Sequence, residues 1–294
     1  MLQLKYKSKF GCIEFSGGGS AKGCKIINIT GLGLPKKSYK TIEFASENGV
    51  TQTSEKDMVR TITITAELLG DKNDCRKISR VFHESGELYV ASDTVRRKIK
   101  CKTTQPPEFT RLGGCGVGIY TFTVQLQADY PYFTNFYLTE QALFKVKNLI
   151  IDEFTLPCVF TERIAKGIIN NNGDKRIFPK INILNLSDVS EVSPIEEADI
   201  PSNILYIKNI TTDAVIIINH IMQKNELITI DMETRRIYSN LDGDITNQLD
   251  DDSILANFYI DIGENEIEFK NTNVTNQNLS ATIIFSPEYF SVEV

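Results

Sequence analysis

The 294-residue sequence contains no tryptophan, only two histidines and no long apolar run. A membrane-spanning helix needs ~18 or more consecutive apolar residues, and no stretch of the chain approaches that length. The N-terminal residues Met-Leu-Gln-Leu-Lys-Tyr-Lys lack the continuous apolar segment of a secretion signal. We therefore expect a soluble protein that is made in the cytoplasm and has no contact with a membrane.

Metal-binding and disulfide patterns are equally scarce. The six cysteines include no Cys-x-x-Cys pair, and none is spaced with His83 or His220 as in a zinc site. A chain of this length has room for about two domains of ~150 residues, each of which can bury its own core without disulfides. We expect free thiols in a reducing compartment and no metal or other cofactor.

No catalytic constellation is recognisable in the sequence, so no enzymatic activity is expected. Neither histidine has a sequence neighbour that would orient it as a general base, and each is interpreted as structural. The segments Gly17–Ser20 and Gly113–Gly118 match neither a Walker A motif nor a dinucleotide-binding motif. Cys115 lacks a matched base, which leaves a nucleophile interpretation weak.

An acidic segment, Asp242–Asp252, resembles a calcium loop only superficially. Counting from Asp242, the sixth position is Asn247 where an EF-hand needs glycine, and the twelfth is Ser253 where it needs glutamate. A turn with an acidic rim is the favoured interpretation, and a casual cation site remains the alternative.

Charge is distributed unevenly along the chain. Residues 1–165 carry 23 Lys and Arg against 17 Asp and Glu, whereas residues 166–294 carry 9 against 21. This asymmetry indicates two domains with different surroundings. The basic residues of the first part are scattered over separate segments instead of forming one patch, so nucleic-acid recognition is not expected.

Alternating polar and apolar residues dominate the first part of the chain. Thr61–Ala66 and Tyr120–Gln127 alternate strictly, as half-buried antiparallel strands do. One helix is predicted over Lys72–Ser85, capped by Asp71 and ended by Gly86, with its apolar residues on one stripe. A sheet with a single helix against it follows from these patterns.

A polar, turn-rich segment follows Gly33. It predicts a protruding two-stranded arm in which Tyr39–Phe44 pairs with Val50–Thr53 across an Asn48-Gly49 turn. An isolated hairpin is marginal in water, so such an arm needs a partner surface. A mobile loop is the alternative interpretation of the same residues.

The last part of the chain contains short β-rich runs separated by polar turns, which predict an all-β sandwich. The runs are Ile181–Leu184, Ile204–Ile207, Val215–Ile218, Leu227–Ile230, Phe258–Ile262, Glu266–Phe269 and Thr282–Phe285. Before them, Ile168–Ile183 places Asn-Asn-Asn-Gly-Asp between two apolar runs. These residues are typical either of a ligand loop or of a joint between domains. Only Asp174 offers a carboxylate there, which favours the joint.

Several segments together resemble the phage distal tail protein family, and the resemblance extends over nearly the whole chain. They are Gly31–Pro35, the Asn48-Gly49 arm, Arg60–Gly70, the helix, Arg97–Cys101, Asp129–Phe133, Asn171–Asp174 with Phe178–Ile183, Ile207–Thr212, Ile228–Asp231, Arg236–Tyr238 and Ile262–Ile267. Their order and spacing carry the resemblance, because no single motif is specific.

The resemblance implies a mainly β structure. Its N-terminal domain, residues 1–135, would be a β-sandwich or split barrel with one α-helix and a β-hairpin arm, and would form a ring. Residues 136–170 would be a transition segment. Residues 171–294 would form a C-terminal galectin-like β-sandwich.

The resemblance also implies a function as a structural distal tail protein, or baseplate hub, of a phage or phage-tail-like particle. Six copies would form a ring at the virion tail tip, assembled in the bacterial cytoplasm. The ring would join the tail tube protein to the tail-tip protein and could dock receptor-binding proteins. Lys36, Tyr39 and Asn48 in the arm are the predicted intersubunit contacts.

A glycan-binding module attached to a tail or cell-surface assembly is the alternative hypothesis, because β-sandwiches often bind sugars. Sugar rings stack on aromatic side chains, with tryptophan the best platform. Since the chain lacks tryptophan, Tyr206, Tyr238 and Tyr259 would have to take its place.

Overall fold

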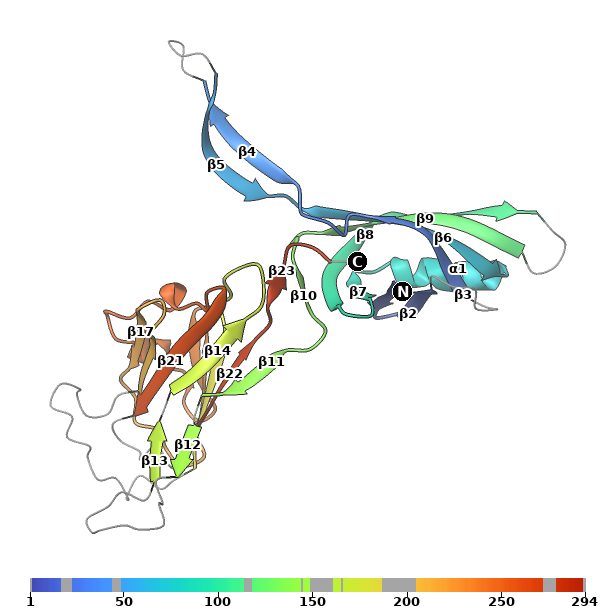
Figure 1. Cartoon of the computed structure of the whole chain (residues 1–294). Coiled ribbons are helices and arrows are strands. Elements are labelled where there is room, and N and C mark those ends of the chain that lie inside the picture. Colours follow the sequence, from blue (N-terminus) through green and yellow to red (C-terminus); the bar gives the residue numbers. More distant parts are fainter. Residues whose placement is uncertain are drawn as a thin grey trace, which may run out of the picture. The chain divides into compact units, whose positions relative to one another are not determined.

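The computed structural model describes residues 2–16, 23–43, 49–113, 118–143, 145–148, 161–164, 166–186, 205–271 and 279–292. Its contacts divide the chain into two compact units. Unit 1 comprises Met1–Phe136 and Glu288–Val294, and unit 2 comprises Tyr137–Pro287. The structure is mainly β, as predicted (Figure 1).

Unit 1 is built on a closed barrel of seven strands. In order around the barrel they are β8 (Arg96–Leu112), β7 (Gly86–Ala91), β1 (Gln3–Ser8), β2 (Gly11–Ser16), β3 (Gly23–Thr30), β6 (Arg60–Gly70) and β9 (Gly118–Ala128), which pairs again with β8. The long strand β8 closes the barrel because residues 96–101 pair with β7 and residues 102–112 pair with β9. The register of β8 against β9 shifts between Thr103 and Glu108, where Pro106 and Pro107 supply no backbone N–H for the ladder.

The core of unit 1 follows from the alternation seen in the sequence. Every second residue of β6 and of β9 is buried, and the residues between them are more exposed. Strands of this kind present one face to the barrel interior and the other to solvent. The interior is filled by branched and aromatic side chains, including Tyr6, Phe15, Ile64 and Val124.

One α-helix, α1 (Lys72–Phe82), is present in the part of the chain that is described, and it packs on the barrel. Asp71 caps it by accepting hydrogen bonds from the backbone N–H groups of Asn73 and Asp74, and Asp74 completes the capping box. The predicted cap is thus confirmed, whereas the helix ends at Phe82 and not at Ser85. Phe82 stacks on Tyr6 with ring centroids 4.7 Å apart, which fixes the helix to the core.

Two short strands extend the sheet beside β8. They are β10 (Phe133–Asn135) and β23 (Glu288–Tyr289), which pair with each other, while β10 also pairs with β8. A separate two-stranded ribbon consists of β4 (Lys37–Ile42) and β5 (Thr51–Asp57). We call this ribbon the arm; Figure 1 shows it apart from the barrel sheet.

Unit 2 contains two main sheets that share one core. The six-stranded sheet has the order β11 (Thr139–Ala142), β22 (Leu279–Phe285), β15 (Lys180–Asn185), β18 (Leu227–Asp231), β19 (Arg236–Ser239) and β20 (Gly243–Asp244). The four-stranded sheet has the order β14 (Lys166–Asn171), β21 (Gly263–Asn271), β16 (Leu205–Asn209) and β17 (Ala214–Ile218). A further pair is β12 (Lys145–Asn148) with β13 (Thr161–Ile164), and two short 3₁₀ helices are η2 (Thr246–Gln248) and η3 (Leu255–Asn257).

Alternate residues of both main sheets enter a single apolar cluster, which includes Ile183, Ile207, Ile230 and Phe269. Six of the seven predicted β-rich runs fall on strands. The seventh prediction, Phe258–Ile262, is wrong, because this segment follows η3 and pairs only through an isolated bridge between Ile260 and Ile177. Phe258 and Ile260 are buried, so the apolar pattern reflects burial without a ladder.

Unit 1 ends at Phe136, one residue from the predicted limit at residue 135, whereas unit 2 begins at Tyr137 and not at residue 171. Strand β11 and all of β14 except Asn171 lie within the predicted transition segment, residues 136–170, and both pair with strands of unit 2. The last residues, from Glu288 onward, return to unit 1. These pairings join segments distant in the sequence, and the local pattern of residues carries no information about them.

The segment Ile168–Ile183 connects β14 of one sheet to β15 of the other sheet, both inside unit 2. The interpretation as a joint between domains is therefore corrected. Its turn is held by Asn171, whose Nδ2 donates to Lys175 O over 2.8 Å and whose Oδ1 accepts from Gly173 N–H over 3.0 Å. Asn171 is buried, so this asparagine orders the turn instead of binding a ligand.

Candidate functional site

The arm is the most unusual surface of unit 1, because it has no core of its own. All described side chains of β4 are exposed, and so are those of β5 except Asp57. The two strands pair with each other from Lys37↔Asp57 to Ile42↔Thr51, with one register shift after Lys40. A two-stranded ribbon with both faces in solvent buries too little surface to be stable alone. The arm therefore has the character of an interaction element.

The predicted intersubunit residues occupy different places. Tyr39 lies in β4 opposite Glu55, and its side chain is 53% exposed. Lys36 is exposed at the base of the arm, where its carbonyl accepts the Met58 N–H over 2.7 Å. Asn48 lies outside the described residues. Strand β4 starts two residues earlier than predicted, and β5 continues to Asp57, because the base is closed by this hydrogen bond.

The base of the arm is attached to the segment Asp129–Phe133, which is rich in aromatic residues and contains Pro131. Tyr132 donates its hydroxyl hydrogen bond to Asp57 Oδ2 over 2.5 Å. Burial of the phenol and this hydrogen bond raise the pKa of Tyr132, so the hydroxyl stays a donor at neutral pH. The ring of Tyr132 also packs edge-on against Tyr130, with centroids 4.9 Å apart. This contact fixes the point at which the arm leaves the barrel.

Arg60, three residues beyond the end of the arm at Asp57, holds three other chain segments to the start of β6. Its guanidinium donates to the carbonyls of Pro131 (2.7 Å), Gly31 (2.7 Å), Gly33 (2.5 Å) and Phe290 (2.6 Å). Arg60 is buried, and its burial lowers the pKa to about 10, so the side chain remains charged at neutral pH. A buried cation must be satisfied by hydrogen bonds, and these carbonyls provide them.

Gly31 makes this arrangement possible. Its φ of +91° lies in the region that favours glycine, and a Cβ at this position would lie 2.1 Å from Thr61 O. The chain can therefore turn closely against β6 and present two carbonyls to Arg60. The Gly31–Pro35 segment, which contributes to the family resemblance, thus has a specific structural role.

The C-terminal segment was not connected to unit 1 by sequence reasoning. Arg97 stacks on Tyr289 with 3.6 Å between its guanidinium carbon and the ring centroid, and it also donates to Ser291 O. Val292 N–H donates to Leu32 O over 3.0 Å. One signal in the sequence was available: Arg60 occupies the inward phase of the alternation that continues with Ile62 and Ile64, which indicates a buried charge in need of partners.

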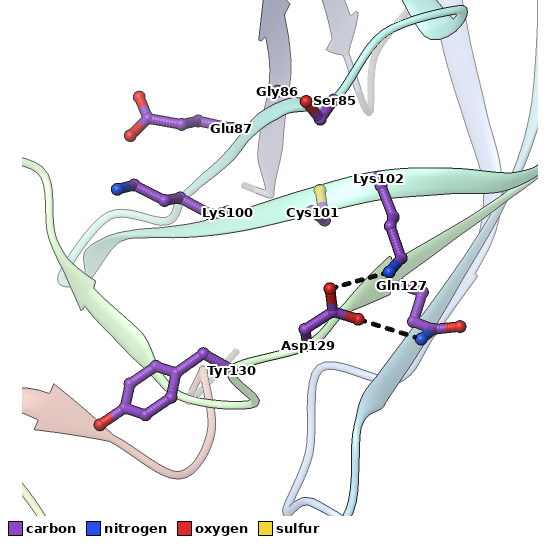
Figure 2. A pocket seen from close by; sticks show the side chains of 9 residues that line it. All are labelled: Ser85, Gly86, Glu87, Lys100, Cys101, Lys102, Gln127, Asp129 and Tyr130. Atoms are coloured by element: carbon purple, nitrogen blue, oxygen red, sulfur yellow. Dashed lines mark hydrogen bonds and ion pairs between the residues drawn. The ribbon is translucent and has the colours of Figure 1, made fainter.

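A shallow depression of about 610 Å³ lies on the barrel, lined by residues of β7, β8 and β9 and their flanks (Figure 2). Within it, Asp129 accepts from Lys102 Nζ over 2.8 Å and from Gln127 Nε2 over 3.1 Å. The hydrogen bond from Lys102 is the main cause of a lowered pKa at Asp129. Burial raises the pKa of the Cys101 thiol to about 12, so it is not a thiolate nucleophile at neutral pH.

The sequence singled out His220 and Asp242 separately, and the structure brings them together. His220 Nε2 lies 2.7 Å from Glu226 Oε1 and 3.9 Å from Asp242 Oδ2. Glu226 was missed by sequence reasoning. Two other acidic residues of the segment Asp242–Asp252 order turns, as the favoured interpretation of the sequence predicted. Asp244 Oδ1 accepts from Thr246 N–H, and Asp250 Oδ1 accepts from Asp252 N–H. The other histidine, His83, follows α1 and is exposed.

The three tyrosines considered for sugar binding do not form one platform. Tyr206 and Tyr238 alternate with buried residues in β16 and β19, so they point to the outer faces of two sheets that enclose the core. Tyr259 packs against Arg176 and Phe178, with 5.0 Å and 6.5 Å to the ring centroid. A sugar site built from all three is excluded by this geometry.

Comparison with known proteins shows a similarity in the last part of the chain. Residues 190–289 match the family described as siphovirus-type tail component, C-terminal domain. No curated protein matches the sequence. Among the residues described, no helix is both long and apolar enough to cross a membrane. The matching part of the chain is thus similar to a tail component of long-tailed phages.

The Dit protein of phage SPP1 shares the fold over nearly the whole chain. Its structure, described as a paradigm of the hub adsorption apparatus in phages that infect Gram-positive bacteria, matches with a TM-score of 0.63 and 11% identity. The similarity covers 98% of this chain and 99% of that chain. Two structures of the phage p2 baseplate in its activated conformation, one with Ca and one with Sr, each match at a TM-score of 0.46 and 11% identity. Each match covers 97% of this chain and 98% of the p2 chain. The match over residues 190–289 and the fold shared with SPP1 Dit agree with the resemblance to the phage distal tail protein family that the sequence suggests.

Proposed function

We propose that this chain is a distal tail protein, the baseplate hub of a phage or phage-tail-like particle. The match of residues 190–289 to a siphovirus-type tail component is the observation that carries the proposal. The fold shared with SPP1 Dit over nearly the whole chain is consistent with it. The protein acts as a scaffold in the virion tail and binds its neighbours through complementary surfaces.

Six copies close into a ring through unit 1. Rings arise when one patch of a subunit meets a different patch of the next subunit and the rotation closes. The arm supplies one such patch, because its strands expose both faces. Exposed apolar side chains lie at Tyr39 and Ile42 in β4 and at Val50, immediately before β5. Lys36, Tyr39 and Asn48 are the intersubunit contacts of this proposal.

The two faces of the ring meet the tail tube protein and the tail-tip protein, and unit 2, proposed to be galectin-like, docks receptor-binding proteins at the periphery. The charge of the units supports different partners. Unit 1 has 20 basic and 15 acidic residues, whereas unit 2 has 12 basic and 23 acidic residues. Because the two units carry net charge of opposite sign, each favours partners of a different charge and disfavours the partners of the other unit.

An arm-shortened variant tests the ring directly. Residues 38–56 are replaced by a two-residue Asn-Gly turn between Lys37 and Asp57, which are cross-strand partners and can close a tight hairpin. This change keeps the contact of Asp57 with Tyr132. We expect the parent chain to be hexameric by multi-angle light scattering and the variant to be monomeric with unchanged circular dichroism. A variant that remains hexameric would contradict the role of the arm.

Glycan binding by unit 2 is the competing function. A glycan array with host cell-wall fragments separates the two, because a hub without sugar recognition gives no saturable signal.

A further inference from the structure

Three side chains with metal-binding atoms converge in unit 2 from separate segments. His220 follows β17, Glu226 precedes β18, and Asp242 lies in the turn between β19 and β20. Their nitrogen and oxygen ligand atoms all lie within 4.8 Å of one another. Nothing in the proposed hub function requires this cluster.

The ring of His220 is oriented so that Nε2 faces the two carboxylates. Its Nδ1 lies 2.6 Å from Gln248 Oε1, an oxygen that can only accept, so Nδ1 carries the hydrogen. In the neutral ring Nε2 is then a lone-pair donor directed at Glu226 Oε1, 2.7 Å away. Two lone pairs at this distance need a positive species between them. A carbonyl acceptor on the other ring nitrogen is also the usual surrounding of a metal-binding histidine.

The carboxylate of Glu226 is fixed in place and fully buried. Ser239 Oγ donates to Oε1 over 2.5 Å, and the Gln223 N–H donates to Oε2 over 2.7 Å. Glu226 is 0% exposed, whereas the side chain of Asp242 is 44% exposed. A buried charge is unfavourable unless it is neutralised. One proton on His220 balances one of the two carboxylates, and a divalent cation balances both.

We propose that His220 Nε2, Glu226 Oε1 and Asp242 Oδ2 bind one divalent cation of the zinc class. An imidazole ligand favours zinc over magnesium and calcium, which prefer oxygen ligands alone. Three protein ligands leave a fourth position for water. Binding displaces any proton from Nε2 and widens the gap between Nε2 and Oε1, because ligands about 2.0–2.2 Å from zinc lie further apart than 2.7 Å.

A cation at this position fastens the segment between β17 and β18 to the β19–β20 turn. The segment between β17 and β18 is already attached to the end of β15 by Asn185, whose Nδ2 donates to the carbonyls of Met222 and Gln223, both over 3.2 Å. The role that the proposal gives the cation is to order this end of unit 2.

Isothermal titration of the metal-stripped full chain with zinc chloride tests the proposal. We expect one site for each chain and a higher thermal midpoint in the presence of zinc. Asp242→Asn removes a charged ligand from the exposed side of the cluster, which leaves the buried pair intact, and should weaken binding about tenfold or more. The matched control is Asp251→Asn, an exposed acidic residue nearby in the sequence, which should bind zinc as the parent chain does.

Two further variants separate this site from adventitious surface ligands. His83→Ala and Cys12→Ser remove an exposed imidazole and an exposed thiol of unit 1, and both should leave zinc binding unchanged. Absence of zinc binding by the parent chain would overturn the proposal, as would an Asp242→Asn variant that binds zinc with the affinity of the parent chain. Binding of calcium in preference to zinc would also overturn it, because the imidazole would then not be selecting the cation.

Discussion

Strands β5 and β6 follow each other with only Met58 and Val59 between them, yet their surroundings are opposite. In β6 every second side chain, from Arg60 to Gly70, is buried in the barrel. In β5 every side chain except Asp57 is exposed. Both pair with antiparallel neighbours along their whole length, β6 in unbroken register with β9 and β5 with one register shift against β4. What differs is the presence of a core beneath them.

This difference indicates where each strand obtains its stability. Strand β6 is stabilised within unit 1 by apolar burial, which contributes about 25 cal/mol for each Å² removed from water. The arm has no comparable burial, so its order at the base depends on Tyr132 and on the Lys36–Met58 hydrogen bond. We therefore expect substitutions in the barrel to lower the free energy of unfolding and substitutions in the arm to affect assembly.

The largest loss of stability is expected for Ile64→Ala in β6. Ile64 is completely buried, and removing a buried isoleucine side chain lowers the free energy of unfolding by about 2–5 kcal/mol. Urea unfolding followed by circular dichroism measures it. The matched substitution in the arm is Ile42→Ala, which should change the value by less than about 0.5 kcal/mol. Equal losses at the two positions would remove the contrast between arm and barrel.

Arg60→Ala comes next, with a loss of about 3 kcal/mol, because four carbonyls lose a charged donor inside the protein. The C-terminal segment is held partly through Phe290 O, so limited proteolysis should release residues after 287 faster in this variant. Arg76→Ala, on the exposed side of α1, is the control. A stable Arg60→Ala variant with a protected C-terminus would show that Arg60 is dispensable.

Gly31→Ala should lower stability by about 1–3 kcal/mol, because alanine is strained at positive φ. The added Cβ would also meet Thr61 O. Gly33→Ala provides a close control, since a Cβ there meets nothing within 4 Å. Differential scanning calorimetry of the two variants should give a lower midpoint for Gly31→Ala alone, and similar midpoints would contradict the assigned role of Gly31.

Tyr39→Ala has the smallest expected effect on unfolding, below about 0.5 kcal/mol, because the ring is half exposed in the arm. Its effect on assembly should be large, since exposed aromatic side chains often dominate interfaces. Sedimentation velocity should show dissociation at higher protein concentration than for the parent chain. Lys72→Ala, at the exposed start of α1, should sediment as the parent chain does.

Local patterns predicted the elements well, because burial in this fold alternates along each strand. The alternation at Thr61–Ala66 and Tyr120–Gln127 marked β6 and β9, and Asp71 marked the start of α1. The arm was one of two interpretations of a polar segment around the Asn48-Gly49 dipeptide, with a mobile loop as the alternative, and the paired strands β4 and β5 confirm the arm. What could not be predicted is pairing between distant segments, such as β10 with β23.

Each feature that was misread or missed depends on contacts between segments that are distant in the sequence. Phe258–Ile262 is apolar because Phe258 and Ile260 are buried, and it has no ladder partner beyond one bridge. Ile168–Ile183 was interpreted as a joint because asparagine and glycine mark turns, but a turn between two sheets has the same composition as a linker. The His220 cluster escaped notice because Glu226 and Asp242 meet it only in the folded chain.

Negative-stain electron microscopy of the purified chain, beside the arm-shortened variant, shows whether the chain forms the proposed ring. We expect six-fold rings with a central channel for the parent chain and single particles without rings for the variant. Dispersed monomers of the parent chain at high concentration would contradict the proposed hub.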